Sequence, residues 1–337
     1  MQKARNQTRR RSQQGLTMVE LLVAMVISTV IAIAAISALI VSRQGFTSVD
    51  ASSQLRDNAR FAIDLIQRLG VQAGFLDIEF AAKIRPTNNA LIEANPPPNV
   101  SGFNNSKADP TDPLNTAIAR TSGSVGYGSD VLILRNQTSE TFPGSGVSDR
   151  SMIDCAGNAS ANLPTELATL DNRVISVIHV DLGSDGEPSL RCTYLTSAGT
   201  FATQPIVQGV ENFQVLYGVD NVTAGTAPTG STDTVTDRYL RADQMVVSGN
   251  TVATNANWRR VRSLRIGMVI RGAVGSAQSN TSQTYYPFGP AQSSSTAAIG
   301  SAMSSTNDLG TIFTPTPDNR MRQVVTFTVY LRNSQGL

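Results

Sequence analysis

Few side chains in this chain have the types and spacing needed for acid–base or metal chemistry. There is one histidine, His179, and no G-x-S-x-G motif of a serine hydrolase accompanies it, so a structural histidine on a strand is the simpler prediction. The acids Asp181, Asp185 and Glu187 offer oxygen ligands for calcium, but their spacing differs from that of an EF-hand loop and also fits a hairpin turn. These residues therefore predict neither a catalytic site nor a metal site.

Two other segments suggest binding and also have simpler explanations. Residues 123–130, GSVGYGSD, are rich in glycine but precede a strand, whereas a phosphate-binding loop opens a helix. A basic row could contact nucleic acid or an acidic partner, but its alternation predicts the solvated face of a strand; its members are Arg259, Arg260, Arg262 and Arg265. We expect no nucleic-acid partner, no cofactor and no enzyme activity.

The chain has two cysteines, Cys155 and Cys192. Without neighbouring histidines they make a poor metal site. Outside the cytoplasm they could form a disulfide, which in the chain-entropy model would add roughly 3–4 kcal/mol of stability. Two buried free thiols are the alternative that the sequence leaves open.

The most unusual acid is Glu20, because an uncharged apolar run begins directly after it. Residues 21–41 are long enough to span a bilayer as a helix. Basic side chains without any acid precede the run, at Lys3, Arg5, Arg9, Arg10 and Arg11. This asymmetry predicts a cytoplasmic N-terminus and an exported remainder. Since the whole chain carries a net charge of +2, its basic balance comes from these first residues.

The stretch QQGLTMVELLVAMVIS (13–28) resembles the class III signal of type IV pilins and pseudopilins. That signal has a basic leader, a glycine, an apolar first mature residue, a glutamate at the fifth mature position and then a hydrophobic helix. The resemblance implies that a prepilin peptidase cleaves between Gly15 and Leu16 and that the new amine of Leu16 is methylated. Leu16 departs from the family, which usually has phenylalanine there.

The same resemblance gives Glu20 a role in assembly. In a filament, its carboxylate would lie in a core of low dielectric and would need a cation, because an unpaired buried charge is costly. The family implies the N-terminal amine of Leu16 in a neighbouring subunit as that cation. The alternative is a carboxylate that merely stays at the membrane edge.

The apolar pattern predicts that one helix continues beyond the membrane. No proline occurs before Pro86, and apolar residues follow a 4-3-4-3 spacing at Leu55, Ala59, Ala62, Ile66 and Leu69. Phe61 and Leu65 are expected to widen this face. Gly70 is the expected C-terminal stop of the helix.

Strand patterns fill much of the remaining sequence. Residues 173–183 and 189–196 predict a hairpin, and four further strands are expected within 130–135, 206–220, 258–272 and 322–333. Polar insertions rich in turn formers separate them, at 76–130, 221–257 and 273–319. The insertions could carry interactions or act as variable spacers.

Several of these stretches resemble PilW-type minor pilins. They are NARFA (58–62), QAGF (72–75), the strands at 206–220 and 258–272, and the final LRN (331–333). The resemblance implies an α+β type IV pilin fold, in which a long N-terminal helix packs on an antiparallel sheet. It divides the chain into a leader (1–15), a membrane or filament-core half of the helix (16–43), an amphipathic half (44–70) and a head (71–337).

The function implied is that of a minor pilin that helps to prime pilus assembly, at the tip with other minor pilins and a PilY-type adhesin, supporting adhesion and twitching motility. Its partners would be the prepilin peptidase, the other minor pilins, the major pilin and the inner membrane, where it waits before assembly with its head in the periplasm. A J-type pseudopilin of type II secretion is one alternative. A membrane-anchored periplasmic enzyme or binding protein is another.

Overall fold

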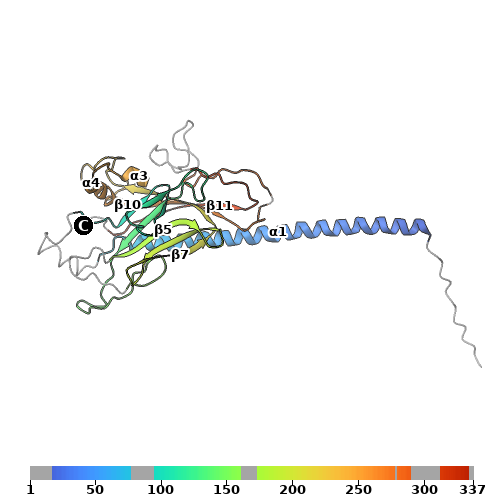
Figure 1. The fold of residues 1–337 in the computed structure, drawn as a ribbon, viewed down its shortest axis with the longest axis horizontal. Helices are drawn as coiled ribbons and strands as arrows, with labels where there is room; N and C mark the ends of the chain where they lie inside the picture. Colours follow the sequence, from blue (N-terminus) through green and yellow to red (C-terminus); the bar gives the residue numbers. More distant parts are fainter. Residues whose placement is uncertain (1–16, 77–94, 161–172, 278, 290–311, 334–337) are drawn as a thin grey trace, which may run out of the picture. The chain divides into compact units, whose positions relative to one another are not determined.

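The computed structural model describes residues 17–76, 95–160, 173–277, 279–289 and 312–333. The chain divides into two compact units between Asp50 and Ala51. The first contains the N-terminal part of helix α1 (Met18–Gln72), and the second contains the rest of α1 and all the strands (Figure 1). We call the second unit the head.

The N-terminal part of α1 is apolar on every side. α1 is long and apolar enough to cross a membrane, with a mean hydropathy of 2.6 over an 18-residue window that is 0% buried in the protein. Hydroxyl groups in this part bond to their own helix: Ser28 Oγ donates to the carbonyl of Ala24 at 2.6 Å, and Ser37 Oγ to that of Ile33 at 2.8 Å. Polar groups paired in this way suit lipid or the interior of a helix bundle.

The head part of α1 is amphipathic, as predicted. Its buried face is formed by Ala51, Leu55, Ala59, Ala62, Ile66 and Leu69. The prediction for Phe61 was wrong, because this side chain is 54% exposed, while Leu65 is half-buried. At about 100° per residue, Phe61 lies roughly a third of a turn away from the centre of the buried face, beyond the reach of the strands.

The predicted end of α1 was also wrong. The helix continues to Gln72, and the left-handed residue that follows is Gly74, at φ 75°, whose N–H donates to the carbonyl of Arg135 at 2.9 Å. Gly70 serves a different purpose: it is buried, and a Cβ there would lie 2.6 Å from Cγ1 of Val329. Gly70 therefore allows a strand to approach the helix closely.

Gly70→Ala should destabilise the head by about 1–3 kcal/mol, because the added methyl overpacks against Val329 and this cost exceeds the gain in helix propensity. Urea unfolding of a fragment beginning at Ala51 would measure the change. In a Val329→Ala background the same substitution should be close to neutral. An equal loss in both backgrounds would contradict the steric explanation.

Two antiparallel sheets and a small third sheet form the head (Figure 1). The five-stranded sheet has the order β1 (Val100–Phe103), β4 (Val131–Asn136), β5 (Val174–Leu182), β6 (Pro188–Leu195), β7 (Phe201–Gln208). The four-stranded sheet has the order β11 (Arg322–Tyr330), β10 (Val261–Arg271), β8 (Val210–Val219), β9 (Arg238–Leu240). The third sheet pairs β2 (Ser106–Ala108) with β3 (Ala117–Ala119).

The predicted strands are confirmed, and the β5–β6 hairpin has the expected antiparallel pairing. The sequence analysis missed β7. In the polar segment 221–257 it also missed the short strand β9 and the short helix α3 (Ala242–Met245), and it missed a second short helix, α4 (Thr251–Trp258), which begins in that segment and ends one residue beyond it. The segment 76–130 also contains three short strands, β1, β2 and β3. Parts of these polar segments are therefore ordered pieces of the head.

The main core lies between α1 and the two sheets. Side chains of α1, of the inner faces of β4, β5 and β6, and of β8 and β10 form one cluster, in which Tyr217 packs edge-to-face on Trp258 with ring centroids 4.7 Å apart. A second cluster covers the outer face of the five-stranded sheet, where Val131, Ile133 and Val177 meet Ala108 of β2. Since both faces of this sheet are covered, β4 is buried along its whole length.

Three arginines hold a proline-rich segment against the head. The carbonyls of residues 96–98 accept hydrogen bonds from Arg259 at 2.8 Å, Arg173 at 2.9 Å and Arg135 at 2.7 Å, respectively. Proline has no N–H, so in such a segment the backbone offers only acceptors. Donors from β4, the start of β5 and the end of α4 satisfy them.

Candidate functional site

The N-terminal end of α1 carries the predicted assembly residue Glu20, whereas Gly15 and Leu16 lie outside the described residues. The carboxylate of Glu20 accepts hydrogen bonds from the N–H and the Oγ1 of Thr17, both at 3.0 Å. In return, the N–H of Glu20 donates to Oγ1 of Thr17 at 3.3 Å. This reciprocal arrangement is a capping box, for which T-x-x-E is the sequence signal.

The capping box gives Glu20 a task within its own chain. A helix leaves its first N–H groups without partners, and a negative charge in the first turn also interacts favourably with the helix dipole. The residues Thr17 to Glu20, TMVE, contain this signal, which the sequence analysis did not use. A role of Glu20 between subunits must therefore be separated from its role at the helix end.

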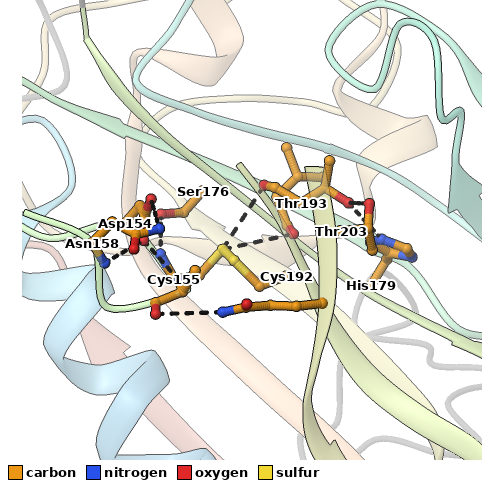
Figure 2. Close-up of a disulfide and its surroundings, with 11 residues drawn as sticks. Asp154, Cys155, Asn158, Ser176, His179, Cys192, Thr193 and Thr203 are labelled. Carbon is orange, nitrogen blue, oxygen red and sulfur yellow. Dashed lines mark hydrogen bonds between the residues drawn. A yellow bond between two sulfur atoms is a disulfide. The ribbon is translucent and has the colours of Figure 1, made fainter. Parts of the chain in front are cut away.

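The structure joins Cys155 to Cys192, with the Cα atoms 5.6 Å apart (Figure 2). The bridge fastens the loop before β5 to β6. Two further contacts fix this loop: the N–H of Cys155 donates to Oγ of Ser176 at 2.9 Å, and Oδ1 of Asp154 accepts from the N–H of Asn158 at 2.9 Å. Both cysteines are buried in the main core, the cluster that also contains the buried side chains of α1.

His179 lies on the opposite face of the five-stranded sheet from the disulfide. Its Nε2 is 3.0 Å from Oγ1 of Thr193, which is 2.7 Å from Oγ1 of Thr203 (Figure 2). Burial lowers the pKa of His179 to about 4. The imidazole is therefore neutral at physiological pH, and its hydrogen-bond partner is a threonine hydroxyl on the neighbouring strand.

Replacing His179 with asparagine should change how the head responds to acid. The pKa of His179 is about 4 in the folded head and 6.5 in the unfolded chain. As the pH falls, the unfolded chain therefore binds a proton at His179 before the folded head does. The wild-type head therefore loses roughly 1.4 kcal/mol of stability per unit as the pH falls through this window. His179→Asn lacks this loss. Between pH 6.5 and 4, its free energy of unfolding, measured with urea, should therefore rise by about 3 kcal/mol relative to that of the wild type.

Thr203→Val is the matched control for this prediction. It removes the Thr203 hydroxyl, which bonds to Thr193 and not to His179, and it keeps the imidazole. The pH dependence of its stability should therefore follow that of the wild type. A stability difference between His179→Asn and wild type that stays constant across the window would contradict the prediction.

The three acids considered for calcium have separate partners. Asp181 is 3.9 Å from the ammonium of Lys107, and Asp185 accepts the N–H of Glu187 at 3.1 Å, as expected for a hairpin turn. Glu187 bonds to arginine side chains instead. Among the described residues, no group of three or more histidine, cysteine or acidic side chains is placed to hold a metal ion.

Glu187 belongs to an ion-pair cluster that the sequence analysis missed. We use this name for three arginines and three acids, namely Arg271, Arg320, Arg322, Glu187, Glu211 and Asp318. Arg322 bonds Glu211 at 2.6 Å and Asp318 at 2.7 Å, and Arg320 holds the pKa of Glu187 below its usual value. The cluster connects the β5–β6 turn, β8, β10 and the start of β11.

Two cavities border the ion-pair cluster, with volumes of about 300 and 550 Å³. Arg271 lines both of them. The smaller cavity also touches Gln54 and Asn58 of α1, and the larger one reaches the glycine-rich segment 122–127. Because the arginines and acids at these walls already neutralise one another, the cluster is suited to holding the head together.

The basic row predicted on a solvated strand face is instead half-buried and bonded within the head. Arg259 and Arg260 lie in the turn after α4 and bond backbone carbonyls, Pro96 O and Gly230 O, at 2.8 Å each. Arg262 pairs with buried Asp220 at 3.2 Å. Arg265 lies 6.0 Å from the ring centroid of Tyr239. The prediction was wrong because it treated a turn and a strand as one alternating element.

The glycine-rich segment ends in a buried carboxyl group. Asp130 directly precedes β4 and accepts the N–H groups of Asn105 and Val215, both at 2.8 Å. Burial raises the pKa of Asp130 to about 7. Its own N–H donates to the carbonyl of Phe213 at 2.7 Å, so Asp130 connects the start of β4 to β8 of the other sheet. This is a structural contact between sheets.

Two family models match the chain. One describes a prokaryotic N-terminal methylation motif and matches residues 10–36. The other describes the type IV pilus-assembly protein W, PilW, and matches residues 177–333. No curated protein matches the chain. A solved structure, a type IV-like pilin (TTHA1219) from Thermus thermophilus, aligns with 12% identity and a TM-score of 0.34, over 84% of this chain and 98% of that chain.

The two family matches cover the parts of the chain that carry its distinctive features. The first covers Arg10, Arg11, the capping box and the first turns of α1. The second runs from β5 through the disulfide residue Cys192 to the end of β11. The chain therefore combines an N-terminal segment that matches the prepilin methylation motif with a head of which residues 177–333 match the PilW family.

Proposed function

We propose that this chain is a minor pilin that helps to prime the assembly of a type IV pilus. The observation that carries the proposal is the combination of a prepilin methylation motif with a PilW head on one chain. Pilins are structural proteins, and the part of the head that the structure describes offers ion pairs and hydrogen bonds that fasten elements to one another. Assembly is accordingly the activity that the geometry supports best.

The mechanism is a transfer of α1 from lipid to protein. The basic leader would keep the N-terminus in the cytoplasm, the apolar part of α1 would hold the chain in the inner membrane, and the head would lie in the periplasm. A prepilin peptidase would cleave between Gly15 and Leu16. The freed helix could then enter a bundle of other pilin helices, where Glu20 would pair with the amine of Leu16 of a neighbouring subunit.

The finer role that we propose is at the pilus tip. There the chain would act with other minor pilins and a PilY-type adhesin, beside the major pilin, and would support adhesion and twitching motility. Deletion and complementation, scoring surface pili, twitching and protein secretion separately, would test this role. Loss of secretion with normal piliation would instead assign the chain to type II secretion, as a J-type pseudopilin.

The N-terminus of the mature protein tests the processing step. Mass spectrometry should find Leu16 as a methylated first residue in cells that contain the peptidase. A mature chain that still begins at Met1 would favour a membrane-anchored periplasmic enzyme or binding protein.

Glu20→Gln should separate the two roles of this acid. Glutamine keeps an oxygen that can cap α1 but removes the charge, so pairing with the Leu16 amine would be lost. We expect Glu20→Gln to be cleaved normally and to enter pili about tenfold less than wild type or worse, as Glu20→Ala should. Immunoblots of sheared pili, with N-terminal sequencing, would measure both steps.

The matched control is Thr17→Ala, which removes the hydroxyl of the capping box and leaves the charge of Glu20 in place. It should enter pili nearly as well as wild type. If Glu20→Gln assembled normally and Thr17→Ala did not, Glu20 would act only as a helix cap.

A further inference from the structure

In the part of the chain that the structure describes, the outer edge of β11 carries backbone groups without partners. β11 pairs with β10 on one side, as the hydrogen bonds from Leu331 N–H to Arg262 O at 2.9 Å and from Gly272 N–H to Met321 O at 2.8 Å establish. The backbone N–H and C=O groups of successive strand residues point to opposite sides in the plane of the sheet. Those of the odd-numbered residues of β11 therefore point toward β10, and those of the even-numbered residues point away from it. Within the described structure no backbone partner occurs for the outward groups, which belong to Val324, Thr326, Thr328 and Tyr330.

The other long outer strand, β7, is protected from pairing with a further strand. Pro205 lies within it and has no N–H to offer, and a register shift against β6 occurs beside Pro205, between Leu190 and Arg191. β11 has neither device. Its nine residues, RQVVTFTVY, contain no proline or glycine and are rich in β-branched and aromatic side chains. An edge of this kind either pairs with another strand or becomes prone to aggregation.

The exposed edge of β11 is held rigidly from behind. Val325 and Val329 point into the main core, and Val329 packs on Gly70 of α1. On the other face, Val324 is 36% exposed and Tyr330 is 69% exposed. A partner strand would therefore find a fixed row of donors and acceptors, flanked by side chains that can contact it.

The direction of β11 argues against a second copy of the chain as the partner. The start of β11 lies near Ala51, because Gly272 contacts both Met321 and Ala51, and its end lies near residues 70–73, where Asn333 donates to the carbonyl of Val71. β11 thus runs in the same direction as the head part of α1. Antiparallel self-pairing would set the head parts of two α1 helices in opposite directions, whereas the helix bundle proposed above needs helices that run in the same direction.

We propose that the edge of β11 binds an extended segment of a different pilin-like subunit by β-strand addition. This inference rests on the proposed function, because it takes the partner from the same assembly. The partner segment must be free of proline over about four to five residues, since every outward N–H and C=O of β11 calls for a complementary backbone group. Backbone hydrogen bonds would give the affinity, and Val324 and Tyr330 would add contacts that choose among partners.

A pair of substitutions at Thr328 tests the backbone directly. Thr328→Pro removes an N–H that points away from β10, so the pairing within the head is kept, whereas Thr328→Ala removes only the side chain. A photo-crosslinking phenylalanine analogue at Tyr330, in the full chain in cells, reports the partner. We expect it to capture a pilin-like subunit with a processed N-terminus, identified by mass spectrometry, and we expect Thr328→Pro but not Thr328→Ala to reduce capture at least tenfold.

Two controls keep the experiment decisive. Val324→Pro removes another outward N–H and should act like Thr328→Pro, and thermal unfolding should show that at least one of the two proline variants remains folded. The same analogue at Phe142, an aromatic side chain that is 64% exposed elsewhere on the head, should not capture the same subunit.

Several results would overturn the inference. They are capture of a second copy of the chain, no capture from Tyr330, equal capture from Phe142, or equal effects of proline and alanine at Thr328. If the chain still complements piliation while Tyr330 captures nothing, the strand addition fails and the proposed function stands. If complementation itself fails, the proposed function is at fault.

Discussion

Arg322→Met should destabilise the head by about 3–5 kcal/mol. Arg322 is only 5% exposed and holds the 8%-exposed Glu211 and Asp318 at 2.6 and 2.7 Å. Removing it leaves Glu211 as a buried charge that has lost a close partner. Urea unfolding of the fragment that begins at Ala51 would measure the loss.

The second substitution Glu211→Leu should recover much of the stability lost in Arg322→Met, because it removes the buried charge. Arg241→Met is the matched control, since Arg241 pairs with the more exposed Asp243 at 3.0 Å. That exposed pair should contribute less than about 1 kcal/mol. If the two arginine variants lost equal stability, the ion-pair cluster would have no special importance for the head.

Removing the disulfide should cost nearly as much. The loop that Cys155 and Cys192 close has a sequence separation of 37, for which the chain-entropy model gives about 4 kcal/mol. Cys155→Ala with Cys192→Ala should therefore lower the melting temperature of the head by many degrees, measured by calorimetry or circular dichroism.

Reduction of the wild-type head provides the control for this prediction, because it opens the same loop without changing the sequence. Its melting temperature should fall close to that of the double alanine variant, and adding reductant to the variant should change nothing. A wild-type head that melts at the same temperature with and without reductant would contradict the prediction.

The elements that the sequence predicted are those in which the pattern is local. The apolar spacing from Leu55 to Leu69 placed the buried face of α1, and alternation together with the turn GSDGEP placed the β5–β6 hairpin. Phe61 shows the limit of the method, since an apolar type alone does not say whether a strand lies opposite. The end of α1 depended on Gly74 meeting Arg135, a contact between distant parts of the chain.

The missed elements depend on tertiary contacts. α4, TVATNANW, has weak helix formers, but Asn250 caps it at 2.9 Å, Asn257 bonds the carbonyls of Met245 and Thr226, and Trp258 reaches the core. β7 contains Pro205, which argues against a strand unless the strand lies at an edge. Such elements form because the rest of the head is present.

The ion-pair cluster could not be predicted for the same reason. Its members lie between Glu187 and Arg322 in the sequence and meet only because β8, β10 and β11 are neighbours. The capping box is the opposite case, because the signal TMVE is local: Thr17 and Glu20 are three residues apart and need no other part of the chain to bond to one another.

Arg135 fastens both flanks of the segment 77–94. Its carbonyl accepts the N–H of Gly74 at 2.9 Å, its own N–H donates to the carbonyl of Asn99 at 2.8 Å, and its guanidinium binds Pro98. The chain on both sides of this segment is therefore bonded to one residue of β4. The entropy cost of closing a loop between two fixed ends grows only slowly with the number of residues. Lengthening the chain between these two anchors, for example by a short epitope, should therefore change the free energy of unfolding of the head by less than about 1 kcal/mol.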